Sequence, residues 1–140
     1  MSDTGITSGT RASAASRGRV LSVTLWALQA LLALVFAMAG LAKVGGDAAM
    51  VEMFATIGVG QWLRYVVGAL EITGALGVLI PRLSGLAALG LVCLMVGATL
   101  TNVFVLGTSP LLTVGLLVLS GLVAWGRRER TWALLGGLGR

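Results

Sequence analysis

Four long apolar segments restrict what this sequence can fold into more than any other feature. About 20 apolar residues cross a bilayer as a helix, and the segments at residues 20–44, 61–80 and 86–106 reach that length. The fourth, at residues 110–126, is shorter and has to use its flanks or thin the bilayer locally. With 57% hydrophobic residues, the 140-residue chain carries more apolar side chains than a soluble domain of that size can bury. Because the runs are continuous rather than alternating, a membrane β-barrel is excluded and four transmembrane helices are predicted.

The predicted organisation is one membrane domain, residues 20–127, between two cytoplasmic tails. Residues 1–19 are rich in Ser, Thr, Gly and Ala and predict a disordered tail, and residues 128–140 form the other tail. A cleaved signal peptide is the alternative for the first apolar run. Its length of about 17 residues before a small-residue site exceeds the usual ~7–15 and favours a retained helix. After the first span, Asp47 is a predicted N-cap for residues 48–57, which are too few to span and are expected at the interface.

The distribution of basic residues predicts the orientation, because short turns make neighbouring spans antiparallel. Only Lys43 and Arg64 fall on one side of the membrane. The other eight basic residues fall on the opposite side: Arg11, Arg17, Arg19, Arg82, Arg127, Arg128, Arg130 and Arg140. This asymmetry predicts that both termini are cytoplasmic. It also explains the net charge of +5 by topology and attraction to anionic headgroups, so no nucleic-acid partner is expected.

The chain lacks the residue types that most metal and redox sites need. It contains no His, and its single Cys, Cys93, lies inside an apolar run. Without imidazole there is no His-ligated haem, zinc or copper, and one Cys makes neither an internal disulfide nor an iron–sulfur cage. We therefore expect no metal site, no catalytic residues and no autonomous enzyme.

Glu71 is the most informative polar residue because it falls ten residues into the second span. At 1.5 Å per residue it lies about 15 Å deep, where a carboxylate costs roughly 2.5–3.5 kcal/mol on insertion scales and usually faces a partner. Spacings of 4, 3 and 4 place it on one helix face with Arg64, Gly68 and Ala75. This face is therefore predicted to pack against another helix.

The first span carries a matching face with polar ends and small residues between them, made of Gln29, Ala33, Phe36, Gly40 and Lys43. We predict that the two faces meet, with Lys43 approaching Glu71 from the outer side. Arg64 is the less suitable partner because it lies about 10.5 Å away along the same helix. Asn102, near the outer end of the third span, is expected to hydrogen-bond into this cluster. The candidate intramembrane polar site comprises Glu71, Lys43, Asn102, Arg64 and Gln29, and either clamps the helix register or serves a ligand, proton or headgroup.

Short motifs in a particular order carry a family resemblance. The first span ends in FAMAGLAK, from Phe36 to Lys43, and the second contains GALEITGALG, from Gly68 to Gly77. Together with the short helix between them, and over about residues 20–127, this order resembles the DoxX-like family of four-helix membrane proteins. The resemblance implies a bacterial plasma-membrane four-helix bundle with Lys43 and Glu71 as its signature polar pair. It also implies a link to redox biology, because the family is named after a subunit of a thiosulfate:quinone oxidoreductase.

Three functions follow as hypotheses. The first is a non-catalytic accessory subunit of a redox-linked membrane complex, with a membrane or peripheral redox protein as partner. The second is a quinone- or lipid-binding component that uses Glu71, Lys43 and Asn102 as polar contacts in an apolar pocket, with quinone as the one cofactor considered. The third is a small proton-coupled transporter with Glu71 as the proton carrier. A homo-oligomer is compatible with all three.

Overall fold

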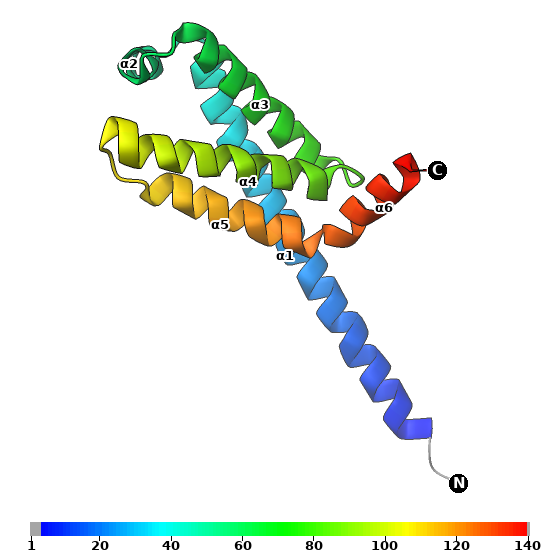
Figure 1. The fold of residues 1–140 in the computed structure, drawn as a ribbon. Helices are drawn as coiled ribbons and strands as arrows, with labels where there is room; N and C mark the ends of the chain where they lie inside the picture. Colours follow the sequence, from blue (N-terminus) through cyan, green and yellow to red (C-terminus); the bar gives the residue numbers. More distant parts are fainter. Residues whose placement is uncertain (1–3, 140) are drawn as a thin grey trace.

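The computed structural model describes residues 4–139 as an all-α protein, with no strand in that range. Its elements are α1 (Thr4–Val44), α2 (Ala48–Ile57), α3 (Gln61–Leu79), α4 (Ser84–Thr101), the π-helix η1 (Asn102–Leu106), α5 (Leu111–Gly126) and α6 (Arg128–Leu138). Figure 1 shows α3 running beside the second half of α1, and α4 running beside α5. The predicted fold class, an all-α membrane bundle, is confirmed.

Three helical segments are long and apolar enough to cross a membrane, namely Gly9–Val44, Gln61–Leu79 and Ser84–Leu106. A fourth is obtained if α5 and α6, which are bent by 63° relative to each other, count as one broken span. Large apolar side chains cover the outside of the bundle, among them Met38 at 63% and Leu76 at 61% exposure. Such a surface is stable against lipid and not against water, so the outer face is a bilayer-contacting one.

The helices are longer at both ends of the chain than the sequence predicts. Residues 4–19, predicted as a disordered tail, continue α1, whose first half projects away from the bundle (Figure 1). No proline interrupts this stretch, so a helix that tertiary contacts hold farther along continues through it. At the other end, Arg127 leaves helical geometry (φ −109°, ψ 13°), and the predicted tail 128–140 begins as α6.

The core is small and apolar and lies where α1, α3, α4 and α5 meet. Its fully buried members include Leu32, Phe36, Val78, Ala88 and Val123. These residues come from all four helices. The core therefore holds α1 against α3 and α5.

The short helix α2 has the bounds that the sequence predicts. Asp47 is its N-cap, since Oδ1 accepts a hydrogen bond of 3.1 Å from the amide of Ala49. Gly58 ends it in a left-handed conformation (φ +81°), which only glycine adopts without strain. Its own Phe54 is buried, and the side-chain amide of Gln61 donates a hydrogen bond of 3.0 Å to the carbonyl of Val51. These contacts fix α2 across the end of the bundle.

Candidate functional site

The predicted faces of α1 and α3 meet through two glycines. A Cβ atom placed on Gly40 would lie 2.7 Å from the carbonyl oxygen of Gly68, and one on Gly68 would lie 2.9 Å from the carbonyl oxygen of Gly40. Both distances are shorter than ordinary carbon–oxygen contacts, so only glycine permits this approach of the two backbones. The hypothetical Cβ on Gly68 would also lie 3.0 Å from the Cβ of Lys43. The Lys43 side chain therefore passes beside Gly68.

This close contact brings Lys43 to Glu71, and the ion pair that the sequence predicts is present. The Nζ atom of Lys43 lies 3.0 Å from Oε2 of Glu71 and donates a hydrogen bond of 3.2 Å to Oε1. The side chains are 13% and 4% exposed, respectively. Oε2 is the nearer oxygen, and it accepts no hydrogen bond from the residues that the structure describes. Both carboxylate oxygens thus lie within 3.2 Å of the ammonium nitrogen, which neutralises the buried charge.

Arg64 lies on the same face of α3 as Glu71 but does not pair with it. Its Nη1 donates to the carbonyl oxygen of Lys43, and its Nε donates to Oε1 of Gln61 at 2.7 Å. The guanidinium also lies over the ring of Tyr65, 4.3 Å from the centroid. A positive charge at the carbonyl end of a helix is favourable, so buried Arg64 caps α1 and holds Lys43 from the backbone side.

A cavity of about 260 Å³ opens beside this ion pair, and we call it the Lys43 cavity. It lies between the end of α1, α2, α3, α4 and η1. Its polar side chains are those of Lys43, Asn102 and Thr101, and its apolar lining is Met53, Phe54, Ile57, Leu63, Val67, Leu94, Gly97, Ala98 and Leu106. Lys43 therefore reaches two environments at once, the buried carboxylate and an apolar cavity.

Asn102 enters the cavity wall through a local change of helix type. It begins the π-helix η1, in which its carbonyl oxygen accepts from the amide of Gly107, five residues along, and from that of Thr108 at 2.9 Å. Such wide turns are frequent at functional sites. The expected hydrogen bond from Asn102 to Lys43 or Glu71 is absent from the described part of the chain. The side-chain amide of Asn102 has no hydrogen-bond partner between residues 4 and 139, and it shares the cavity with Lys43 instead.

Gln29 does not join this cluster, which corrects the predicted grouping. Its side-chain nitrogen donates to the carbonyl of Val78 at 2.6 Å, and its oxygen accepts from Nε of Arg127 at 2.9 Å. Gln29 shares a helix face with Lys43, but 14 residues of α1 separate their depths by about 21 Å. The matching faces therefore hold two polar clusters, one toward each end of α1.

Arg127 is the important residue that sequence reasoning missed. It is only 7% exposed, its Nη2 is buried without a hydrogen bond to any described residue, and its guanidinium carbon lies 5.7 Å from the centroid of the Trp26 ring. A terminal arginine after an apolar run is normally read as an interfacial anchor. The spacing of residues could have indicated its burial, since Arg127 follows buried Ser120 and Val123 at helical intervals of three and four residues and so lies on their face of α5.

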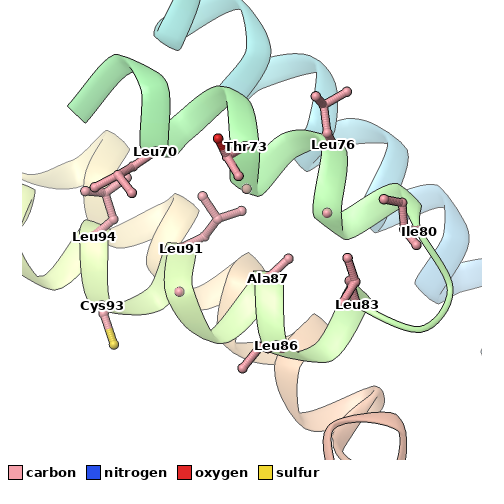
Figure 2. Close-up of a pocket in the computed structure, with 13 residues that line it drawn as sticks. Leu70, Thr73, Leu76, Ile80, Leu83, Leu86, Ala87, Leu91, Cys93 and Leu94 are labelled. Atoms are coloured by element: carbon pink, nitrogen blue, oxygen red, sulfur yellow. The ribbon is translucent and has the colours of Figure 1, made fainter. Parts of the chain in front are cut away.

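A further cavity, of about 620 Å³, is an open groove between α3 and α4 (Figure 2). Leucines dominate its lining, and the hydroxyl of Thr73 already donates to the carbonyl of Ala69 at 2.7 Å. Cys93 lies at the edge of the groove with its sulfur directed away from it (Figure 2). No charged side chain lines this groove, so it offers acyl-chain contacts and no polar chemistry.

Comparison with known proteins adds one finding to this geometry. A family model described as the DoxX-like family matches residues 27–136, more than three quarters of the chain. The matched segment includes the Lys43–Glu71 ion pair, α2, η1 and the Gln29–Arg127 cluster. No curated protein and no solved structure matches the chain.

Proposed function

The chain belongs to the DoxX-like family of membrane proteins, and from this premise we propose that it binds the head group of a lipid-soluble ligand, a quinone, in the Lys43 cavity. In this role it is a non-catalytic component of a redox-linked membrane complex. The observation that carries the proposal is the double position of Lys43, which lines an apolar cavity while Glu71 neutralises its charge from below.

The chemistry of the cavity suits a quinone ring. A quinone presents two carbonyl acceptors and an apolar ring, and the cavity offers an ammonium donor from Lys43 and an amide donor from Asn102. Ligand sites are commonly apolar with a few polar groups that orient the ligand. The volume of about 260 Å³ is just below the ~300–1,000 Å³ of pockets for drug-sized molecules, so a single ring fits while its tail extends into the bilayer.

Binding rather than electron transfer is supported by the residue types of the chain. It has no His and one Cys, so its side chains supply no relay for electrons. Electrons would therefore pass between the quinone and a partner protein, which makes an accessory role the natural one. Affinity purification from native membranes in mild detergent should recover a reproducible redox partner. A protein that is consistently recovered alone would contradict the accessory role and leave ligand binding standing.

The proposal is tested by titrating the purified full-length protein in nanodiscs with decylubiquinone and recording calorimetric binding. Replacing Asn102 by Leu removes one neutral hydrogen bond, which is worth roughly 0.5–1.5 kcal/mol, so we expect binding about two- to tenfold weaker. The double variant Lys43→Gln with Glu71→Gln keeps the pair neutral and removes the ammonium donor, and it should bind more weakly still.

Thr73→Val is the matched control because it removes a hydroxyl in the α3–α4 groove and leaves the Lys43 cavity intact. If this variant alone loses decylubiquinone, the ligand occupies the groove and the proposal is wrong. Wild-type protein that does not bind decylubiquinone also refutes it. In parallel, proteoliposome flux that depends on a pH gradient and is abolished by Glu71→Gln would assign the protein to proton-coupled transport instead.

A further inference from the structure

Another cavity, of about 470 Å³, lies at the arginine-rich end of the bundle, on the far side of the core from Lys43. It separates the turn between α3 and α4 from the helix α6. Its lining includes Pro81 and Arg82 from the turn, and Arg130, Ala133, Leu134 and Leu138 from α6. We call it the Arg82–Arg130 cavity.

Specific contacts hold the two walls of this cavity in place. The Nη1 atom of Arg130 donates a hydrogen bond of 2.9 Å to the carbonyl oxygen of Pro81, which ties α6 to the turn. Gly85, at the start of α4, packs against the junction of α5 and α6, where an added Cβ would lie 2.7 Å from the carbonyl oxygen of Arg127. The 63° bend between α5 and α6 is therefore supported by tertiary contacts from the α3–α4 turn and from the start of α4.

The charge of the cavity is strongly positive. Arg82 is exposed and makes no hydrogen bond or ion pair with any residue in the described range, 4–139. Arg130 uses one of its five N–H donors on Pro81 and retains the others. The acid nearest in sequence is Glu129, the only acidic residue of α6, and it is exposed and does not line the cavity.

We propose that the Arg82–Arg130 cavity binds an anionic diacyl phospholipid. The two guanidinium groups hold the phosphodiester, since arginine donors match phosphate oxygens in pairs. Leu134 and Leu138 form the apolar part of the lining and contact an acyl chain, which free phosphate lacks. Trp132, 71% exposed on the same helix, is of the residue type that favours the headgroup level of a bilayer.

Native mass spectrometry of the full-length protein in a neutral detergent tests this, with phosphatidylglycerol and phosphatidylcholine in competition. We expect wild-type protein to retain one phosphatidylglycerol in preference. An arginine near an anionic headgroup is worth about a fivefold change in affinity, so Arg82→Gln should lower the preference about fivefold. Arg82→Gln with Arg130→Gln should lower it about 30-fold. The single variant Arg82→Gln keeps the Arg130–Pro81 hydrogen bond, so a loss of lipid preference in this variant does not come from undocking of α6.

The matched control is Arg17→Gln with Arg19→Gln, which removes the same charge from the exposed first half of α1. It should change the preference less than about twofold. Equal losses in the two double variants, or a wild-type protein without preference, would show diffuse attraction only and overturn the proposal. Complete displacement of the lipid by inorganic phosphate would also overturn it, because the site would then recognise the free anion.

Discussion

Replacing Gly68 by alanine tests the contact on which the Lys43–Glu71 ion pair depends. The added methyl carbon would lie 2.8 Å from Cγ2 of Val44, 2.9 Å from the carbonyl oxygen of Gly40 and 3.0 Å from the Cβ of Lys43. Carbon–oxygen contacts between close helices are about 3.3–3.6 Å, so α1 and α3 have to separate by roughly half an ångström. Overpacking of this kind typically costs 1–3 kcal/mol, and the Lys43–Glu71 distance should lengthen with it.

Gly115→Ala is the matched control for this substitution. Gly115 is helical, and no heavy atom lies within 4 Å of a Cβ placed on it. There the helix propensity of alanine should dominate and stabilise the protein by up to about 1 kcal/mol. Unfolding by sodium dodecyl sulfate, followed by circular dichroism of the detergent-solubilised protein, measures both variants. Equal stability of Gly68→Ala and Gly115→Ala would refute the argument that the two backbones touch at Gly68.

Three further predictions use the same unfolding assay or a labelling experiment. Lys43→Met should lower the free energy of unfolding by roughly 3–5 kcal/mol because it leaves a buried carboxylate without a partner. Adding Glu71→Leu should restore most of that loss, and a double variant no more stable than the single one would argue against the pair. Arg127→Met should lower the free energy of unfolding by roughly 1.5–3 kcal/mol. A double-mutant cycle with Gln29→Leu should give a coupling energy above about 0.5 kcal/mol, and additive effects would contradict the Gln29–Arg127 hydrogen bond. Cys93, which is exposed on the apolar surface, should react in liposomes with a lipid-soluble maleimide and not with a charged one, and the reverse result would place that surface in water.

The parts of the structure that follow from the sequence are those with strong local or energetic signals. The third span and α2 are marked by uninterrupted apolar character, by Asp47 and by Gly58. The pairing of Lys43 with Glu71 follows from the large cost of an isolated carboxylate in a bilayer together with matching small residues on the two faces. The family resemblance from the sequence agrees with the family match.

The remainder depends on depth and on tertiary contacts, which a helix face does not specify. Gln29 shares its face with Lys43, but a face fixes only the direction around the helix axis and leaves the level along it open. Arg127 resembles an interfacial anchor in the sequence and becomes buried only because Gln29 and Trp26 come from α1 to meet it. The Lys43 cavity requires α2 to lie over the π-helix at Asn102, and no local pattern encodes that docking.

The two polar clusters together fix the helix that carries Lys43, which lines the Lys43 cavity. Lys43–Glu71 joins α1 to α3, and Gln29–Arg127 joins α1 to α5 about 21 Å away, so α1 is held at two depths. A helix fixed at two levels cannot slide or rotate without breaking a buried polar contact at one of them. The wall formed by α2 is held by buried Phe54 and by the Gln61–Val51 hydrogen bond. In the proposed function, a quinone that enters from the bilayer meets Lys43 on a helix held at two depths and α2 on the opposite wall, so it binds without disturbing the ion pair.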